Sequence, residues 1–422
     1  MSNKSLHCTF DDAWLMDGVR TPFVDYNGAL ASTSPTDLGI KVARAVFERT
    51  GVSPSDVGTV IAGNMAQASF DAFMLPRHIG LYSGVPTEVP AHLVQRVCGT
   101  GIEVLSQAAD AVSLGRTDLA LCVGTESMSR NPIAAYTHRG GFRLGKVEFK
   151  DFLWEALLDP AANTTMGDTA ENLAKQYQIT RPEVDNFAAR SFERAIDAQK
   201  SGFLAGEIVP VKSEVFPVEE LTPRGIKIDS ATSEVTGDTH VRPSPIEALA
   251  KIKPAFGGVQ TGGNSSAIVD GAAAILVASS GYLGKSAKVP LARIVASVAV
   301  GVPPHIMGIG PAPAIRNLLA QTGLKLSDID RFEINEAFGA QVMACARKLG
   351  IDENKLNVNG GAIAIGHPLG ATGIRLALTL ARELKASGGR YGIASACIGG
   401  GQGIALLIES AIESRPPTNI RH

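Results

Sequence analysis

The chain has 422 residues, of which 45% are hydrophobic and 19% are charged, values typical of a folded globular protein and not of a disordered one. Its 39 basic and 41 acidic residues give a net charge of -2, which provides no electrostatic reason to bind nucleic acid or an anionic membrane. The length allows two or three domains, or one duplicated fold with an insertion.

The chain shows no targeting or membrane-spanning pattern. The opening MSNKSLHCTFDDAW has no apolar run of signal-peptide length, and no later stretch approaches the ~20 apolar residues that span a bilayer. The cysteines are odd in number and never form C-x-x-C, so we expect neither a disulfide framework nor a zinc site, and we expect a reducing, cytoplasmic location. The five cysteines are Cys8, Cys98, Cys122, Cys345 and Cys397.

The first predicted unit alternates helices and strands. A helical segment ends at Thr50-Gly51, and a turn with Ser55-Asp56 leads into the apolar run VGTVIAGN from Val57. An amphipathic helix follows and runs into the short strand LALCVG from Leu119. Alternating strands and helices with short connections indicate layered α/β structure. The apolar stripe of the helix consists of Ile102, Leu105, Ala109 and Val112.

Residues 128–261 differ from the segments on either side. They are richer in charge and proline, and they contain one strongly helical stretch, TAENLAKQYQITRPEVDNFAARSFERAIDAQKSG, from Thr169. This stretch has its own apolar periodicity, so we interpret the region as an inserted domain and not as a linker.

The pattern of the first unit returns 272 residues later. GVSPSDV from Gly51 matches GLKLSDI from Gly323, and Thr100-Gly101-Ile102 matches Thr372-Gly373-Ile374. The second copy has the apolar run IDRFEINE, a helix with the stripe Ile374, Ala377, Ala381 and Leu384, and the strand YGIASAC. We therefore predict two related halves: residues 1–127, completed by about 262–290, and residues 291–422, with 128–261 inserted between them.

Four stretches carry side chains suited to chemistry. In RVCGTGIE, Cys98 precedes the first amphipathic helix, whose N–H groups and dipole favour a thiolate and would lower the cysteine pKa from its free value of about 8.5. His367 precedes the second helix in NVNGGAIAIGHPLGATG. Cys397 ends a strand in SACIGGGQGIALL, and Asn335 ends a strand in EINEAFGAQ.

Each stretch also has a purely structural interpretation. A lone cysteine is often simply buried, a histidine is often a turn residue, and an asparagine often ties down a loop. The glycines after Cys397 let the backbone approach a ligand, but they also suit an ordinary tight turn.

The duplication favours the catalytic interpretation. The offset of 272 residues matches Cys98 with Gly370, close to His367, and it matches Thr125 with Cys397. It also places Asn335 at the strand end that corresponds to Gly63 in the first copy. If the halves pack with pseudo-twofold symmetry, these ends converge on one pocket, and their side chains suit acyl transfer by a thiolate with a second proton-transfer group.

Competing motifs are absent or incomplete. The sequence contains no G-x-G-x-x-G, no G-x-S-x-G and no H-x-x-x-H. GGFRLGKV from Gly140 has the spacing of a phosphate-binding loop, but Val147 stands where a Mg²⁺-binding Ser or Thr is required. Nicotinamide, nucleotide, serine-hydrolase and zinc chemistry are therefore disfavoured, and we expect no metal.

RVCGTGIE, NEAFGAQ, NVNGGAIAIGHPLGATG and CIGGGQG, in this order, resemble the motifs of the thiolases, and the resemblance runs from Gly18 to Ser410. Thiolases are acyl-CoA:acetyl-CoA acyltransferases, built from duplicated α/β/α layered halves with an inserted loop domain. The resemblance implies that Cys98 becomes acylated, that His367 activates it, and that Cys397 moves the proton at the α-carbon of acetyl-CoA, or at the leaving thiolate in cleavage.

The resemblance also implies two oxyanion holes. Asn335 would hold a water molecule that forms one of them with His367 Nε2. The N–H groups of Cys98 and Gly399 would form the other, and each would stabilise negative charge on a thioester oxygen.

A third implication concerns coenzyme A, which is a substrate in this family and not a permanently bound cofactor. The inserted domain would cover its pantetheine arm, and a homodimer or homotetramer is expected. Thr165 stands where acetoacetyl-CoA-forming relatives often carry His, and Ala248 where they often carry Ser, so the preferred acyl chain stays open. The positions that would line the pantetheine tunnel are Met166, Ser266, Met307 and Phe338.

Two alternatives to a coenzyme-A-dependent thiolase remain. One is a non-catalytic scaffold or lipid carrier that keeps the fold, which would need neither Cys98 nor Cys397. The other is a decarboxylating ketoacyl synthase, which would carry two histidines, or a His and an Asn, around its cysteine and no second cysteine in C-x-G-G-G. The presence of both cysteines favours the thiolase.

Overall fold

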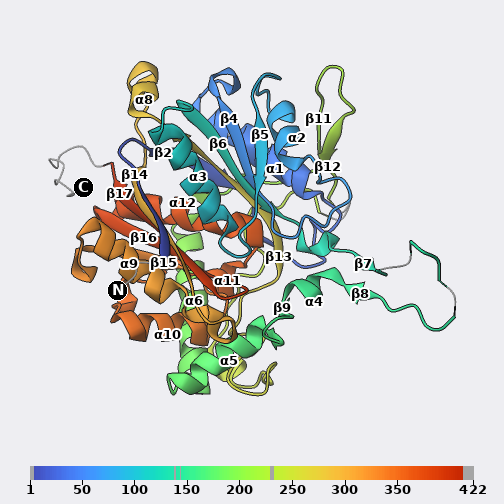
Figure 1. The fold of residues 1–422 in the computed structure, drawn as a ribbon, viewed down its shortest axis with the longest axis vertical. Helices are drawn as coiled ribbons and strands as arrows, with labels where there is room; N and C mark the ends of the chain where they lie inside the picture. Colours follow the sequence, from blue (N-terminus) through green and yellow to red (C-terminus); the bar gives the residue numbers. More distant parts are fainter. Residues whose placement is uncertain (1–3, 137–138, 143, 229–231, 412–422) are drawn as a thin grey trace.

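Figure 1 shows the computed structural model of the chain, which describes residues 4–136, 139–142, 144–228 and 232–411. A central sheet has eleven strands. Two short ones, β1 (Ser5–Thr9) and β3 (Val24–Asp25), pair with β14 and β13. The other nine follow in the order β15 (Arg331–Ile334), β16 (Tyr391–Ile398), β17 (Gln402–Ser410), β14 (Ala292–Gly301), β2 (Trp14–Arg20), β13 (Val269–Ala278), β6 (Leu119–Glu126), β4 (Thr59–Gly63) and β5 (Ala91–Val94).

The two ends of this sheet repeat one another. An offset of 272 residues places β4 on β15 and β6 on β16, and it places the 3-10 turn Pro54–Asp56 on the turn Leu326–Asp328. β4 and β6 are parallel, as are β15 and β16, while β6 and β16 pair antiparallel with β13 and β17. The duplication predicted from the sequence is confirmed, and the two halves join where β2 meets β14.

Helices cover both faces of the strands. α1 and α2 pack on one face of the N-terminal half, and α9 packs on β14 and β17 of the C-terminal half. α12 contacts β6 and β13 as well as β15 and β16, so it lies between the halves (Figure 1). The longer helices are α1 (Pro35–Thr50), α2 (Leu75–Tyr82), α3 (Thr100–Ser113), α5 (Met166–Gln176), α6 (Arg181–Lys200), α9 (Pro311–Thr322), α10 (Gly339–Leu349) and α12 (Leu369–Ser387). The short ones are α4 (Phe152–Ala156), α7 (Ile246–Leu249), α8 (Ser280–Ser286) and α11 (Ala362–Ile365).

Strand β6 shows why these apolar runs form central strands. All eight of its residues are buried. Leu119, Leu121 and Val123 belong to one apolar cluster, whereas Ala120 and Cys122 belong to the other. Successive side chains of a strand point to opposite faces, so a strand covered by helices on both faces needs a continuous apolar run and not an alternating one.

α3 and α12 cross at a pair of equivalent glycines. A Cβ added to Gly101 would lie 2.6 Å from the backbone N of Ile374, and one added to Gly373 would lie 2.2 Å from the backbone N of Ile102. Only glycine lets the two backbones come this close. Because Gly101 and Gly373 correspond under the 272-residue offset, the pseudo-twofold axis passes between them, and the N-terminal ends of both helices meet near one place.

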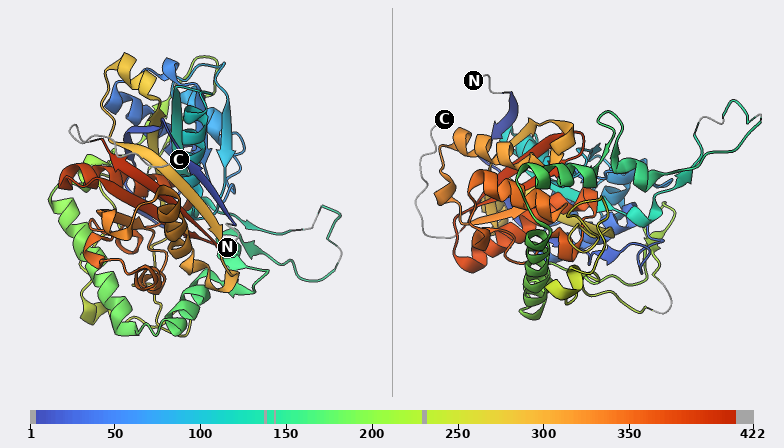
Figure 2. Two further views of the ribbon diagram at one scale, coloured as in Figure 1. Left: turned by 60° about the vertical axis from the view of Figure 1, so that its left-hand side comes forward. Right: turned by 90° about the horizontal axis from the view of Figure 1, so that it is seen from below.

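Residues 128–261 add no strand to the central sheet among the residues that the structure describes. They form three two-stranded sheets, and α5 and α6 pack on α10 of the C-terminal half. One pair of strands is the base of an arm that projects far from the molecule (Figure 2). The pairs are β7 (Ile133–Ala134) with β8 (Lys150–Asp151), β9 (Leu158–Asp159) with β10 (Thr164–Thr165), and β11 (Glu214–Phe216) with β12 (Arg224–Ile226).

The single helical stretch predicted from Thr169 is two helices, α5 and α6. Gln178 interrupts it with a left-handed φ of +51°. Thr180 then begins α6 with a capping box that Glu183 completes, and Pro182 follows in the first turn, where its missing N–H costs nothing.

In the described part of the chain, no helix combines the length and hydropathy needed to cross a bilayer.

Candidate active site

Cys98 lies in a tight turn between β5 and α3. Val97, immediately before it, has a φ of +43°, a left-handed conformation that β-branched residues rarely adopt. Three hydrogen bonds hold the turn: Gly99 N–H to the Arg96 carbonyl (2.9 Å), Thr100 N–H to the Val97 carbonyl (3.2 Å), and Arg96 N–H to Thr100 Oγ1 (2.9 Å). Such strained backbone persists only where its surroundings hold it, and here it places a thiol that is 8% exposed.

Two backbone N–H groups, those of Cys98 and Gly399, lie close enough to the Cys98 thiol to favour its thiolate and to act against a rise in its pKa. Gly399 follows β16, so one donor comes from each half of the fold. Both donors favour the thiolate, but burial outweighs them and, with the negative charge of Glu126 as a smaller cause, raises the pKa of Cys98 to about 11. The expectation that a position before the helix would lower this pKa is therefore wrong.

His367 is buried just before α12, and its hydrogen bonds define its tautomer. Its Nδ1 lies 2.6 Å from Thr372 Oγ1, whose hydroxyl donates to the Pro368 carbonyl (3.1 Å). A hydroxyl that donates elsewhere accepts from Nδ1, so the imidazole proton is on Nδ1. Nε2 then accepts from Asn335 Nδ2 at 3.2 Å. Burial, together with the positive charge of Arg375, lowers the pKa of His367 to about 3, so the ring is neutral near pH 7.

Asn335 and Cys397 lie at the ends of the neighbouring parallel strands β15 and β16, and the Asn335 N–H donates to the Ser395 carbonyl (2.9 Å). Both side chains are fully buried. Burial raises the pKa of Cys397 well above its usual value, and a charge on Cys98 is the next cause, which shows that the two thiols lie within electrostatic reach. Among the described residues, Asn335 Oδ1 has no hydrogen-bonding partner.

Each thiol belongs to an apolar cluster of its own. Cys98 packs with Met65, Met128, Leu153 and Leu369. Cys397 packs with Met166, Met307 and Ala337, and Phe338 lies against this second cluster.

Gly399 lies where the two clusters meet. A Cβ built on it would be 3.2 Å from Met166 Sδ and 3.5 Å from Val97 Cγ1. Three of the four residues expected to line the coenzyme A tunnel therefore surround Cys397. The fourth, Ser266, donates its N–H to the carbonyl of Ala337 (3.0 Å).

The two positions that depart from the family pattern lie in different surroundings. Thr165 is the N-cap of α5, where its hydroxyl donates to Asp168 Oδ2 (2.6 Å) and accepts from the Asp168 N–H (3.2 Å). It directly precedes Met166 of the Cys397 cluster. Ala248 is exposed on α7. Thr165 thus lies beside the thiol site, whereas Ala248 faces solvent.

Glu126 and Thr372 are two site residues that the sequence analysis did not identify. Glu126 ends the otherwise apolar β6 and is 1% exposed. A charged residue at the end of a buried strand was the signal that could have found it. Thr372 follows His367 by five residues, and its role depends on the helix turn that brings its hydroxyl back to the ring.

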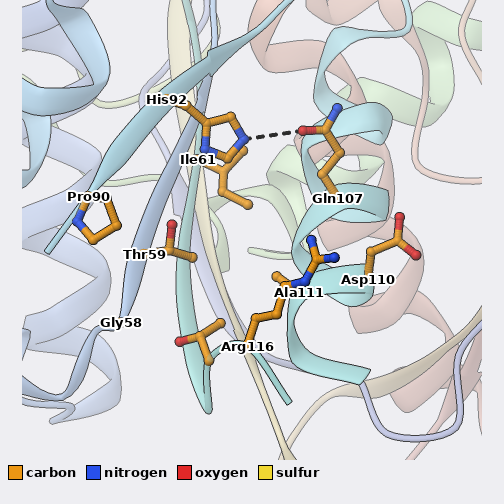
Figure 3. A pocket seen from close by; sticks show the side chains of 10 residues that line it. Gly58, Thr59, Ile61, Pro90, His92, Gln107, Asp110, Ala111 and Arg116 are labelled. Carbon is orange, nitrogen blue, oxygen red and sulfur yellow. Dashed lines mark hydrogen bonds between the residues drawn. The ribbon is translucent and has the colours of Figure 1, made fainter. Parts of the chain in front are cut away.

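A separate pocket of about 470 Å³ lies between α3, β4 and the edge strand β5 (Figure 3). His92 and Gln107 face one another across it, with His92 Nε2 3.2 Å from Gln107 Oε1. None of the candidate catalytic or coenzyme residues lines this pocket.

Within the described residues, no group of three or more His, Cys, Asp or Glu side chains is placed to hold a metal ion.

Comparisons with known proteins agree with this architecture. The models of the thiolase N-terminal domain and the thiolase C-terminal domain match residues 13–281 and 288–410. Mitochondrial 3-ketoacyl-CoA thiolase of Homo sapiens is 42% identical over 395 residues, covering 93% of this chain and 96% of that protein. Beta-ketoadipyl-CoA thiolase of Acinetobacter baylyi is 42% identical over 409 residues, covering 94% and 99%.

Solved structures of such proteins superpose along almost the whole chain. The human mitochondrial 3-ketoacyl-CoA thiolase in complex with CoA has a TM-score of 0.88 at 40% identity, with 95% of this chain and 98% of that chain covered. The acetyl-CoA acetyltransferase of Bacillus anthracis has a TM-score of 0.87 at 39% identity, with 95% and 99% covered. The thiolase fold predicted from the sequence is therefore confirmed, and the chain belongs to the thiolase family of acyltransferases.

Proposed function

We propose that the chain catalyses the reversible CoA-dependent cleavage of 3-ketoacyl-CoA thioesters and that Cys98 carries the acyl group between its two half-reactions. One observation supports this most directly: N–H groups from both halves of the fold lie beside one buried thiol and favour its thiolate. The same donors, on Cys98 and Gly399, are available to the oxygen of an acyl group bound to that sulfur. An oxyanion hole of this kind typically contributes ~3 kcal/mol per donor to transition-state stabilisation.

The first half-reaction begins with proton transfer from Cys98 to His367 Nε2, the ring nitrogen that lacks a proton. The thiolate attacks the 3-keto carbon, and the bond between C2 and C3 of the substrate breaks. The electron pair of that bond goes to C2, which takes a proton from Cys397, and acetyl-CoA leaves. Both thiols and the imidazole are neutral at rest, so the three reacting groups start without charge.

In the second half-reaction, Cys397 takes the proton of the incoming CoA thiol. The CoA sulfur attacks the acyl carbon, the bond to Cys98 breaks, and the Cys98 thiolate recovers its proton from His367. Condensation of acetyl-CoA with an acyl group is the same sequence in reverse. The apolar cluster around Cys397 supports this role because it keeps water away from a thiolate that must act as a base.

The second oxyanion hole is assigned to His367 and Asn335. Asn335 Oδ1 is buried with an unused acceptor position, which suits a bound water molecule. Such a water, with His367 Nε2 once it carries a proton, would donate to the thioester oxygen of acetyl-CoA as the C2 carbanion develops.

Coenzyme A is assigned to the side of the site formed by Met166, Met307 and Phe338, with Ser266 beside them. Phe338 also meets Phe256 edge-to-face at 6.2 Å, which extends the apolar wall toward the inserted domain. Flexible methionines and aromatic rings suit a pantetheine arm, which has a narrow, mostly apolar chain. The structure of the human relative in complex with CoA supports this class of ligand.

A homodimer or homotetramer is also proposed. The arm that carries β7 and β8 projects away from the molecule (Figures 1 and 2) and exposes large apolar side chains at Ile133 (69%), Leu144 (98%) and Phe149 (63%). Isolated chains would leave this apolar surface in water, which favours self-association. Light scattering should give a mass of two or four chains, and a mass of one chain at micromolar concentration would contradict the assignment.

A panel of 3-ketoacyl-CoA thioesters with rising chain length tests the function. Wild-type protein with free CoA should cleave at least one member, seen as loss of the 3-ketoacyl absorbance and formation of acetyl-CoA. The Cys98→Ala variant should cleave none. A wild-type protein that binds the thioesters without turning over any of them would indicate the carrier alternative.

A further inference from the structure

Glu126 is a buried carboxylate that the reaction scheme does not use. All of its hydrogen bonds come from N–H donors. Oε1 accepts from Asn64 Nδ2 (2.9 Å) and the Ala66 N–H (3.2 Å), and Oε2 accepts from the Met65 N–H (2.8 Å) and the Gly370 N–H (2.9 Å). Burial raises the pKa of Glu126 to about 7, and the four donors act against this rise. They favour the ionised carboxylate, because a protonated one would turn an O–H toward N–H groups.

The duplication gives this carboxylate a counterpart at the nucleophile. Gly370 corresponds to Cys98, and Glu126 corresponds to Ile398, the residue before Gly399. At the end of β16, the N–H of Gly399 lies beside the Cys98 thiol and favours its thiolate. At the corresponding end of β6, Glu126 accepts the N–H of Gly370 at the start of α12. The N-terminus of α3 thus lies next to the nucleophile Cys98, whereas the N-terminus of α12 is occupied by the carboxylate of Glu126.

The segments that Glu126 holds are the ones that shape the catalytic site. Gly370 follows His367 by three residues, and Met65 packs directly with Cys98. Gly370 must be glycine for this contact, because a Cβ there would lie 2.6 Å from the Thr125 carbonyl and 3.1 Å from Glu126 Oε2. The carboxylate therefore joins the histidine segment to a wall of the thiol pocket.

We propose that Glu126 is a positioning residue: by accepting the N–H groups of Gly370, Met65 and Ala66, it holds the His367 segment and the 64–66 loop against Cys98. This inference rests on the proposed function, since it concerns how fast Cys98 is acylated. The step it serves is thioester exchange, in which acyl-CoA and the Cys98 thiol give acyl-Cys98 and free CoA.

The neutral, isosteric variant Glu126→Gln separates this role from mere space filling. A glutamine must turn its NH₂ toward either the pair Asn64 and Ala66 or the pair Met65 and Gly370, all of which are donors. Asn64 has little freedom to turn over and accept instead, because its Nδ2 also donates to the Thr125 carbonyl (2.9 Å) and its Oδ1 accepts from Gln67 (2.9 Å). The variant therefore keeps the shape of the side chain, but two of its four hydrogen bonds become repulsive contacts between N–H donors.

The experiment measures single-turnover acylation of Cys98 by mass spectrometry, with CoA release, in wild type, Glu126→Gln and Glu126→Ala. We expect acylation to slow by ~100-fold in both variants, the size of effect that a misplacement of about 1 Å produces, while KM for the acyl-CoA changes by less than about 3-fold. Glu126→Ala removes an acetate-sized group, so acetate should restore at least part of the rate, whereas acetamide at the same concentration should not.

Asp330→Asn is the matched control. Asp330 accepts two backbone N–H groups, those of Arg390 (2.6 Å) and Tyr391 (3.2 Å), at the opposite end of the strands that carry the site. It should change the melting temperature but leave the acylation rate within about 2-fold of wild type, because it touches no catalytic segment. If the Glu126 variants do not fold, Asn64→Ala, which removes one of the four donors to Glu126 together with the side-chain bonds to Thr125 and Gln67, should still slow acylation measurably.

The outcomes are distinguishable. A folded Glu126→Gln variant, or an Asn64→Ala variant, that acylates as fast as wild type would overturn the inference. If Asp330→Asn slowed acylation equally, the inference would also be overturned, because the slowing would then come from general destabilisation of the protein. A wild-type protein that is never acylated on Cys98 would instead refute the proposed function.

Discussion

Cys98 and His367 form a neutral pair and not a thiolate–imidazolium pair. Burial raises the pKa of Cys98 to about 11 and lowers the pKa of His367 to about 3, so proton transfer between them is uphill in the resting site. The two N–H donors at the sulfur recover part of that cost. This arrangement keeps the nucleophile unreactive until a substrate carbonyl is present to be attacked.

The raised Cys98 pKa predicts a specific pH dependence of alkylation. A thiol whose pKa is raised has a smaller thiolate fraction at neutral pH, and that fraction increases ~10-fold per pH unit until the pKa is reached. The rate of carbamidomethylation of the Cys98 peptide by iodoacetamide should therefore climb steadily from pH 6 to 9.5. A plateau below pH 8 would mean that the thiolate already forms in the free protein.

A second prediction separates the roles of the two thiols. Cys397→Ser should still accept an acyl group from an acyl-CoA on Cys98, because the attack uses the nucleophile, His367 and one oxyanion hole, and a CoA thiolate is stable enough to leave before it takes a proton. It should be badly impaired in carbon–carbon bond formation, since a hydroxyl is a far weaker acid than a thiol and shuttles protons poorly near neutral pH. Acylated protein should accumulate in single-turnover mass spectrometry.

His367→Ala is the comparison for this experiment, and it should be slow to acylate as well. A Cys397→Ser variant that accepts no acyl group from an acyl-CoA would show that the thiol of Cys397 is indispensable to acyl transfer onto Cys98. The division of labour between the two thiols would then be wrong.

At the scale of elements, the crossing of α3 and α12 brings the site together. The N-terminal ends of these helices carry Cys98 and His367, and their backbones touch at Gly101 and Gly373. Any side chain there would push the helices apart and separate the two catalytic segments.

The substitution Gly373→Ala tests this packing. Its Cβ would lie 2.2 Å from the Ile102 N and 2.6 Å from the Gly101 carbon, so the helices must shift, and we expect a loss of ~2–3 kcal/mol in the free energy of unfolding with a parallel loss of activity. Gly284→Ala in α8 is the control, because nothing lies within 4 Å of its added Cβ, and it should be neutral or slightly stabilising. Urea unfolding of both variants measures the difference, and equal effects would argue against a backbone contact.

The sequence predicts the elements and the convergence of the catalytic groups better than it predicts their local chemistry. Asn335 and Cys397 could be placed at strand ends because buried strands are continuous apolar runs, and the 272-residue repeat indicated that these ends meet Cys98. The Cys98 pKa could not be foreseen, because burial outweighs the local helix terminus. Glu126 was missed because its donors, Met65 and Gly370, lie close to it only after folding.

For the whole molecule, the duplication explains how one site is built from both halves. Cys98 comes from the first half, and His367, Cys397, Asn335 and Gly399 come from the second. The first half alone would hold the nucleophile without its proton acceptor, and the second half alone would hold the proton acceptor without the nucleophile. The protein therefore needs the pseudo-twofold association of its halves before it has an active site.

The central claim is that Cys98 carries an acyl group during the reaction. Its most direct test is to mix wild-type protein with an acyl-CoA in the absence of a second substrate, quench with acid, digest, and measure the mass of each cysteine-containing peptide. We expect the peptide with Cys98 to gain one acyl group, and addition of free CoA before the quench to remove it. Acyl groups found only on Cys397, or on neither cysteine while 3-ketoacyl-CoA is still cleaved, would contradict the account.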